Sequence, residues 1–298
     1  MNYFDTVHQL LNHPCNKAMK IKALIRILWW KINQMLFHIP GIVQVTPEAQ
    51  CICYTTSSYG GLVIYTKLPE YAEMSLVYRI LRRDDTFIDV GANIGTYSLI
   101  AGSKINHPNG KVYAFEPTES TLTILMRNVL LNDFKQRIEV IPALVSDIDG
   151  VEKFVFCKEA DVNHIAYVKH RNDQNVKEIK AIKLDSFCGA VGLRYIDMVK
   201  IDVEGAEYKV LKGFESYLAH GKVGLLLIEL NAHSKSFGID PDRVLSFLQD
   251  RGYKLYRFGD GYRLYQIYGN RFHVNKPTNI IAAHRSDKAI SRICEFAT

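Results

Sequence analysis

This sequence lacks most of the features that place a chain in a specialised class. Its six cysteines show no spacing typical of a zinc site or a disulfide framework, so we interpret them as reduced thiols of a cytoplasmic protein. We recognise no signal peptide, internal repeat or low-complexity tract. The net charge of +6 is not accompanied by an aromatic and basic motif, which disfavours a nucleic-acid partner. What remains, with 48% apolar and 23% charged residues, is typical of a globular protein with a substantial core.

A long apolar run is also missing, although residues 17–38 carry a helical apolar pattern. One arc of the expected helix holds Ile21, Leu24, Ile25, Leu28, Ile32, Met35 and Leu36. Charges interrupt the run, so it is too short to span a bilayer. Two interpretations stay open. The helix packs on the domain or on a second subunit of a homo-oligomer, or it lies at a membrane surface with Trp29 and Trp30 at the lipid boundary.

The rest of the chain divides into two parts. We expect an amphipathic helix and connector over residues 1–60, and one α/β domain over residues 61–298. At the start of this domain, the run from Gly61 to Tyr65 predicts a strand. Two strand patterns around a polar segment predict an insertion over about residues 150–184.

From residue 86 onward, strand patterns alternate with helical patterns. This alternation predicts a mostly parallel sheet with helices on both faces. Asp260-Gly261 is a turn signal, and it predicts that Tyr262 to Ile267 pairs back as a hairpin strand on the strand before it.

The most informative stretch runs from Thr86 to Ser98, where a strand pattern ends in Asp-x-Gly-x-x-x-Gly and a helical pattern follows. Such a turn directs backbone N–H groups and a helix N-terminus at a ligand. A second apolar run ends at Glu116-Pro117, where a carboxylate can accept both hydroxyls of a ribose. The two strand ends together predict a nucleoside pocket.

Three ligand classes compete for this glycine turn. A phosphate loop requires a lysine that Gly95-Thr96-Tyr97 does not supply, and a nicotinamide-type turn requires a middle glycine that Gly91 to Gly95 lacks. Asp89 would also repel a pyrophosphate. The same acid suits a cofactor with a positive centre and no phosphate, such as S-adenosylmethionine.

At this point a family resemblance becomes specific. The chain from about residue 60 onward resembles the FkbM family of methyltransferases, through Asp89 to Gly95, Phe115-Glu116-Pro117, Leu184 to Phe187, and Ile196-Asp197 followed by Lys200 to Glu207. The resemblance implies a Rossmann-like seven-stranded methyltransferase sheet, mostly parallel, with an antiparallel last strand. It also implies S-adenosylmethionine as methyl donor and a hydroxyl as acceptor, on a sugar, glycan or secondary metabolite.

The resemblance also assigns residues by motif position. The expected cofactor-binding residues are Asp89, Gly91, Ala92, Asn93, Gly95, Glu116, Pro117, Ala143, Ser146 and Asp147. Of these, Glu116 would hold the ribose; the alternative is that it caps the helix that begins near Thr118. Ala143, with Ser146 or Asp147, would border the adenine.

A hydroxyl acceptor must lose a proton, which requires a general base. The candidate catalytic residues are Asp202, Glu204, Glu229 and His233. Lys200 alternates with Asp202, so the two could instead form a buried pair at the strand end. No residue set reaches the specificity of a metal site.

The sequence therefore predicts an S-adenosylmethionine-dependent methyltransferase. Two alternatives stay open: an oxidoreductase that binds a nicotinamide cofactor on a similar sheet, and a methyltransferase fold that binds a partner but has lost turnover.

Overall fold

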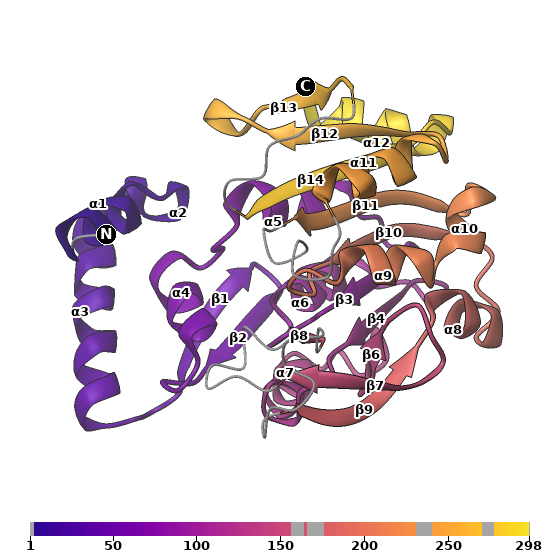
Figure 1. Cartoon of the computed structure of the whole chain (residues 1–298). Coiled ribbons are helices and arrows are strands. Elements are labelled where there is room, and N and C mark those ends of the chain that lie inside the picture. The colour runs from indigo at the N-terminus through magenta and orange to yellow at the C-terminus, as the bar shows by residue number, and fades with distance from the viewer. Residues whose placement is uncertain (1–2, 156–163, 166–175, 231–239, 270–276, 298) are drawn as a thin grey trace.

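The computed structural model describes residues 3–155, 164–165, 176–230, 240–269 and 277–297 (Figure 1). The predicted hairpin strand lies within these ranges, whereas residues 156–163 and 166–175 of the predicted insertion and His233 lie outside them. The helices are α1 (Tyr3–Asn12), α2 (Pro14–Lys17), α3 (Lys20–Leu36), α4 (Ser58–Thr66), α5 (Tyr71–Ile80), α6 (Thr96–Lys104), α7 (Glu119–Leu131), α8 (Leu184–Ala190), α9 (Glu207–Lys212), α10 (Glu215–Ala219), α11 (Pro241–Gln249) and α12 (Asp287–Ala297).

The strands belong to three sheets. They are β1 (Gly41–Thr46), β2 (Ala49–Cys53), β3 (Thr86–Val90), β4 (Lys111–Phe115), β5 (Ile138–Ile141), β6 (Leu144–Val145), β7 (Gly150–Val155), β8 (His164–Ile165), β9 (Val176–Ile182), β10 (Ile196–Ile201), β11 (Val223–Leu230), β12 (Tyr253–Phe258), β13 (Leu264–Ile267) and β14 (Thr278–His284).

The main sheet confirms the predicted fold class. Its strand order is β13-β12-β14-β11-β10-β3-β4-β5. The five neighbouring strands β5, β4, β3, β10 and β11 pair in parallel. β14 is antiparallel to both of its neighbours, β11 and β12. β13 pairs antiparallel with β12 and adds the hairpin strand that the Asp260-Gly261 turn predicts. The described sheet is therefore the expected seven strands plus this edge strand.

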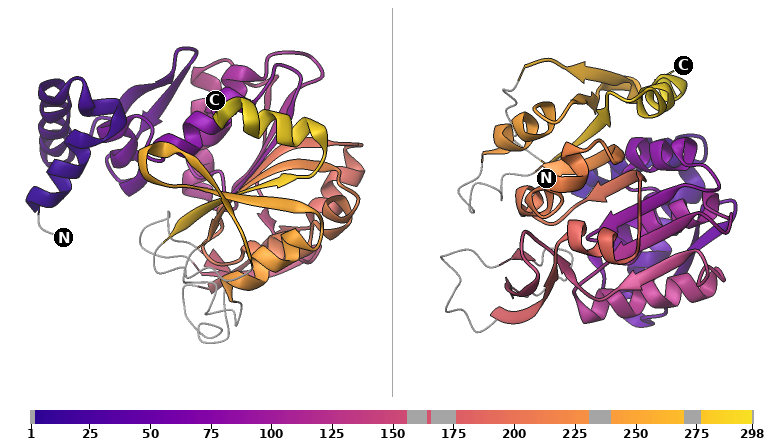
Figure 2. Two further views of the ribbon diagram at one scale, coloured as in Figure 1. Left: turned by 90° about the horizontal axis from the view of Figure 1, so that it is seen from above. Right: turned by 90° about the vertical axis from the view of Figure 1, so that its right-hand side faces the viewer.

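Helices cover both faces of the main sheet (Figure 2). Side chains alternate along each strand, so that Phe87 of β3 joins one apolar cluster and the adjacent Ile88 joins the other. The first cluster includes residues of α5, α6, α7 and α12, and the second includes residues of α8, α9, α10 and α11. The parallel strands are buried from both sides, which explains their continuous apolar sequences.

The predicted strand from Gly61 to Tyr65 is wrong, because these residues belong to helix α4. Ser57 caps this helix, and its Oγ accepts a hydrogen bond from the Gly60 N–H (2.9 Å). Periodicity alone does not separate a short buried strand from a short buried helix, and Val63, Ile64 and Tyr65 are all buried.

Helix α3 packs on the molecule through the side opposite the apolar arc that the sequence pattern predicted. Ala23, Ile27, Trp30 and Asn33 are buried, whereas the apolar arc is exposed. Of the two open interpretations, the one at a membrane surface placed both tryptophans at the lipid boundary; Trp30 is buried and cannot lie there, whereas Trp29 remains exposed. Within the described ranges, no helix combines the length and the apolar character needed to cross a bilayer.

The N-terminal hairpin of β1 and β2 is tied to the main domain by α7. Asn128 accepts a hydrogen bond from the Ile52 N–H (2.6 Å) and donates one to the Ile94 carbonyl (2.8 Å). A single amide thus joins β2 to the glycine turn after β3. In the region of the predicted insertion, β7 pairs antiparallel with β9, and both belong to a small sheet with β6 and β8.

Candidate active site

The turn after β3 accepts only glycine at two positions. Gly91 has φ +76°, and a Cβ there would lie 1.9 Å from the main-chain oxygen of Asp202. Gly95 has φ +92°, and a Cβ there would lie 2.3 Å from Leu125 Cδ1. The positive φ values disfavour any other residue at both positions, and at Gly91 the neighbouring backbone excludes a side chain outright. The turn is therefore fixed between the end of β10 and helix α7.

A cavity of about 280 Å³ opens at this turn, where the carboxyl ends of β3, β4, β10 and β11 meet. Small-molecule sites of roughly 300–1,000 Å³ are typical, so the cavity is near the lower limit for a ligand site. Its lining includes six of the expected cofactor-binding residues: Gly91, Ala92, Asn93, Glu116, Pro117 and Ala143. It also includes the candidate catalytic residues Asp202, Glu204 and Glu229.

Four other expected residues do not line this cavity. Gly95 is the N-cap of α6, and Asp89 is buried beneath the turn. Ser146 is buried, and its hydroxyl donates to Glu152 (3.0 Å), while Asp147 pairs with Lys209 (3.7 Å).

Glu116 is a buried carboxylate whose oxygens already accept three hydrogen bonds. One oxygen accepts from the Thr118 N–H (2.9 Å) and the Thr121 hydroxyl (2.8 Å), and the other from the Asn93 N–H (2.9 Å). Burial raises the pKa of Glu116, and these donors act against that rise. A carboxylate offers about four lone-pair directions, so capping of α7 leaves room for a ligand hydroxyl on the second oxygen.

Lys200 lies at the centre of an acidic cluster beside the turn. Its Nζ is 3.0 Å from Asp202 Oδ2, 3.4 Å from the Gly91 carbonyl oxygen and 4.0 Å from Asp89 Oδ1. Lys200 and Asp202 therefore pair at the strand end, and Asp202 also lines the cavity, so the pairing does not decide between a structural and a catalytic role. Asp89 is adjacent because it is the register partner of Lys200 on β3. Burial lowers the pKa of Lys200, but the carboxylates of Asp202, Asp89 and Glu70 outweigh burial and raise it.

Two glutamates complete the cluster. Burial raises the pKa of Glu229 to about 9, and the neighbouring Asp202 and Glu70 contribute to this rise. At neutral pH the Glu229 carboxyl therefore carries a proton and can donate a hydrogen bond. Glu70 is the N-cap residue of α5, accepts a hydrogen bond from Asn279 (3.2 Å), and has its pKa raised by burial.

The sequence interpretation missed Glu70 and Tyr59, which also line the cavity. Tyr59 belongs to α4 and Glu70 is the N-cap residue of α5, and no cofactor motif includes either of them. Pro69-Glu70 at the start of α5 is a usable signal, because an acidic residue at a helix N-terminus after proline is a common helix start.

The turn after β10 presents Glu204 to the cavity. Glu204 has φ +51° and Gly205 has φ +100°. The Gly205 N–H donates to Glu207 Oε1 (2.8 Å), and burial raises the pKa of Glu207 to about 8. Glu207 thus stabilises the turn through its hydrogen bond with Gly205, which gives the second glutamate of the Glu-Gly-Ala-Glu motif a structural role.

The donor and acceptor set fits the expected cofactor. Glu70, Asp202, Glu204 and Glu229 surround the Lys200 end of the cavity, and Lys200 is the sole cation among the described lining residues. Such a site favours an ammonium or sulfonium group and repels a polyphosphate. Among the described residues, no three His, Cys, Asp or Glu side chains are grouped so that they could hold a metal ion.

Comparison with known proteins agrees with this geometry. The sequence pattern described as "Methyltransferase FkbM domain" matches residues 89–255, which is more than half of the chain. Methyltransferase sdnD of Sordaria araneosa is 28% identical over 57% of this chain and 74% of its own length.

Two further relatives have names that include an acceptor. The hexuronic acid methyltransferase AglP of Haloferax volcanii is 31% identical over 56% of this chain and 62% of its own length. The 31-O-demethyl-FK506 methyltransferase FkbM of Streptomyces tacrolimicus is 27% identical over 45% of this chain and 61% of its own length. The chain thus spans less than two thirds of the length of these two relatives.

Proposed function

We propose that this chain, which belongs to the family of the methyltransferase FkbM domain, transfers a methyl group from S-adenosylmethionine to a hydroxyl of a sugar, glycan or secondary metabolite. The observation that carries the proposal is the meeting of the glycine turn, Glu116 and the acidic cluster at one cavity. The names of AglP and of the FK506 methyltransferase support acceptors of the glycan and secondary-metabolite classes.

Residues at two ends of the cavity would hold the cofactor. Gly91, Ala92 and Asn93 would contact its methionine part, and Glu116 would accept from its ribose hydroxyls. Ala143, which is buried and lines the cavity, would border the adenine. When bound, the cofactor supplies an electrophilic methyl group next to the carboxylates around Lys200.

The acidic cluster favours a neutral acceptor. A hydroxyl group enters a site lined by carboxylates at little electrostatic cost, whereas a carboxylate or phosphate is repelled, so an acidic sugar would have to direct its own carboxylate away from the cluster. The acceptor oxygen must be aligned about 3 Å from the reacting carbon, so positioning is a large part of the catalytic task.

We assign the proton acceptor to Asp202 or Glu204, both at the cavity wall. Glu229 is less suited to this step, because its raised pKa of about 9 leaves it protonated at neutral pH, where it can donate a hydrogen bond to the acceptor. Asp202 is held in place by Lys200. His233 remains a candidate that lies outside the described residues.

The division into an N-terminal extension of residues 1–60 and a methyltransferase domain of residues 61–298 belongs to the same proposal. So does a cytoplasmic location, which the free thiols of Cys15, Cys51, Cys53, Cys188 and Cys294 support.

A labelling experiment tests this function. The protein is incubated with methyl-labelled S-adenosylmethionine and an extract of its source cells, and the labelled product is identified. A base-stable ether label on a hydroxyl supports the proposal. A protein that binds S-adenosylhomocysteine in calorimetry but labels nothing would be a silent binding module, and one that binds a nicotinamide cofactor instead would be an oxidoreductase.

Replacing Glu116 with alanine separates its two roles. We expect Glu116→Ala to weaken S-adenosylhomocysteine binding by about 1.5–3 kcal/mol in calorimetry, because charge-assisted hydrogen bonds to the ribose are lost. Thr121→Val is the matched control, since it removes one of the donors to Glu116 but keeps the carboxylate. If both variants lower the melting temperature and neither lowers affinity, Glu116 is a helix cap only.

Asp202→Asn tests the proton acceptor. We expect kcat to fall about 100-fold, the lower range for the loss of a general base, with a smaller change in S-adenosylhomocysteine affinity. Glu204→Gln is measured in parallel on the acceptor identified by labelling. A larger loss in Glu204→Gln moves the role to Glu204, and full activity in both variants rules out a carboxylate base at this strand end.

A further inference from the structure

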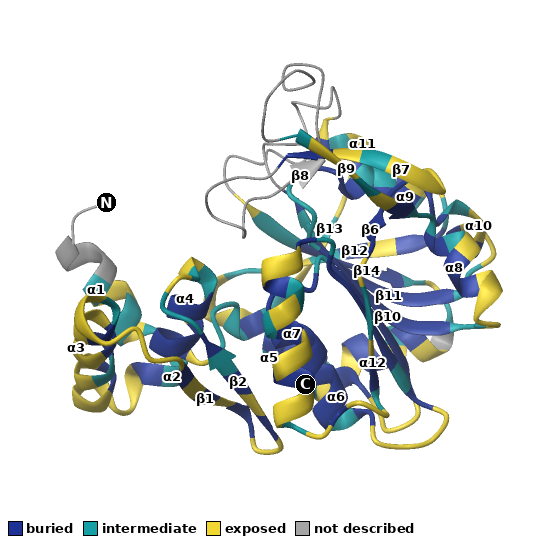
Figure 3. Ribbon diagram, turned by 90° about the horizontal axis from the view of Figure 1, so that it is seen from below, coloured by how far each residue is buried: buried dark blue, intermediate teal, exposed yellow. Residues whose placement is uncertain are grey.

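Helix α3 has two opposite sides with different environments. Ala23, Ile27, Trp30 and Asn33 face the molecule and are buried, and α3 contacts α4. At about 100° per residue, the apolar arc lies on the opposite side. Most of the α3 ribbon is coloured as exposed in Figure 3, and on the apolar arc the exposed fractions are 77% for Ile21, 49% for Leu28 and 77% for Met35.

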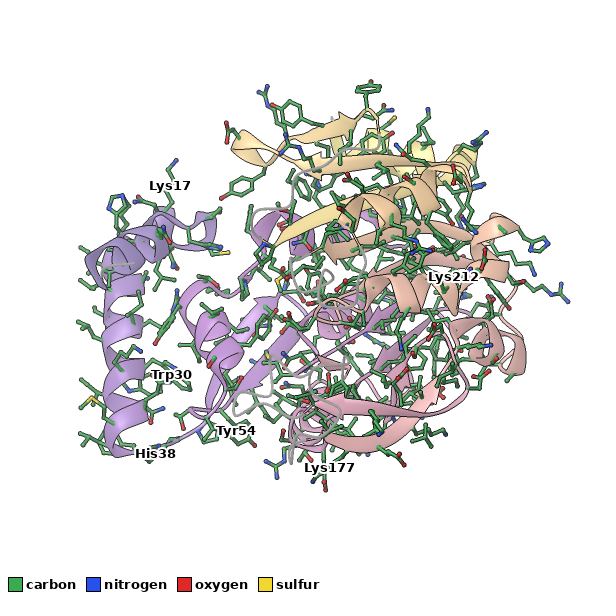
Figure 4. The ribbon with its side chains drawn as sticks, viewed as in Figure 1. Lys17, Trp30, His38, Tyr54, Lys177 and Lys212 are labelled. Carbon is green, nitrogen blue, oxygen red and sulfur yellow. The ribbon has the colours of Figure 1, made fainter. Side chains whose placement is uncertain are left out.

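The exposed apolar surface is concentrated in this region. More than half of the exposed large apolar side chains of the described residues lie between Met19 and Ile42. Figure 4 shows side chains projecting from α3 away from the remainder of the molecule, with Trp30 on the inner side. Apolar patches larger than a few hundred Å² are rare on isolated soluble proteins, so we expect this side of α3 to face a partner surface.

The charges around the patch are all of one sign. No Asp or Glu occurs between Thr6 and Pro47. Lys17, Lys20, Lys22 and Lys31 are exposed. On the helix circumference, Lys20 and Lys31 border one edge of the apolar arc and Lys22 borders the other. The arc is thus an apolar stripe between two cationic edges.

We propose that this side of α3 docks on an anionic lipid surface. The apolar stripe would enter the boundary between headgroups and acyl chains, and the lysines would contact lipid phosphates. Trp29 is exposed next to the stripe, where an indole favours the interface. A second copy of the chain fits less well, because its α3 offers further cations and no carboxylate to pair with these lysines.

The two tryptophans of the chain provide a direct readout. Both lie in α3, and Trp29 is exposed while Trp30 is buried. The full chain is mixed with vesicles of phosphatidylcholine, with and without phosphatidylglycerol. We expect co-sedimentation and a blue shift of tryptophan fluorescence with the anionic vesicles only, and we expect Trp29→Phe to lose the shift but not the sedimentation.

Matched variants test the surface. Leu28→Glu should weaken binding to anionic vesicles at least about tenfold, because a charge replaces an apolar side chain that would enter the lipid. Leu130→Glu on α7 is the control, since Leu130 is 50% exposed against 49% for Leu28. Lys22→Gln and Lys31→Gln should each weaken binding about fivefold.

Three results would overturn the proposal. Equal binding to neutral vesicles would show that anionic lipid is not required. Unchanged binding of Leu28→Glu would show that α3 does not contact the lipid. A dimer in lipid-free solution that Leu28→Glu dissociates would assign the apolar stripe to a second copy of the chain.

Discussion

Replacing Gly91 with alanine is expected to abolish methyl transfer and to weaken S-adenosylhomocysteine binding at least about 100-fold. The added Cβ would lie 1.9 Å from the Asp202 main-chain oxygen. β3 and the end of β10 must then separate, although the Asp202 N–H donates to the Val90 carbonyl (3.1 Å) at this junction. The displacement moves both the cofactor turn and the carboxylates that face the acceptor.

Gly192→Ala is the matched control for this change. Gly192 has φ +73°, and a Cβ there meets nothing within 4 Å, so the variant carries the same backbone strain without the collision. Its cost should be about 1 kcal/mol of unfolding free energy, with affinity unchanged. Binding is measured by calorimetry and folding by circular dichroism. Wild-type affinity in Gly91→Ala would show that the ligand does not lie on this turn.

Replacing Lys200 with methionine is expected to lower the unfolding free energy by about 3–5 kcal/mol, the cost of leaving buried charges unpaired. Lys200 is 6% exposed and faces Asp202 and Asp89. The loss should be larger at pH 8 than at pH 5. Lys200 lowers the pKa values of Asp89 and Glu229, which burial raises, so removing Lys200 raises them further. The folded variant then binds more protons than the unfolded chain over a wider pH range, and its unfolding free energy falls more steeply than that of the wild type as pH rises.

Denaturant unfolding at the two pH values measures this effect. Lys212→Met is the control, because Lys212 is exposed and pairs with Glu215 at the surface, where loss of a pair costs about 1 kcal/mol at most. Adding Asp89→Asn to Lys200→Met should restore part of the stability by removing one unpaired charge. Equal losses in the two lysine variants would mean that the cluster is solvated in solution.

Much of the fold and the cofactor end of the site follows from local sequence. The strand-turn-helix at Gly91 and the strand end at Glu116 are set by short-range chemistry: apolar strands, glycines at positive φ, and carboxylates at helix starts. The antiparallel hairpin strand β13 follows in the same way from Asp260-Gly261. Such features depend on neighbours in sequence and can therefore be read from the sequence.

The features that were missed depend on partners distant in sequence. The apolar pattern predicted that helix α3 exists but not which side of it packs on the molecule. The side with Trp30 is buried, and the wider apolar arc is exposed. Glu70 reaches the cavity from a helix that precedes the sheet, where it meets Asn279. Gly61 to Tyr65 is an exception: its apolar run fits a short buried strand as well as a helix, and the Ser57 cap that marks the helix is local.

The position of β14 has a consequence for the synthesis of this protein. β14 is the last strand that the structure describes along the chain, yet it lies between β11 and β12. Until residues 278–284 have left the ribosome, β11 and β12 each present an unpaired edge, and such edges bind other nascent chains. The sheet therefore closes only after residues 278–284 have emerged, and chaperones that shield the open edges of β11 and β12 until then should raise the yield of the folded protein.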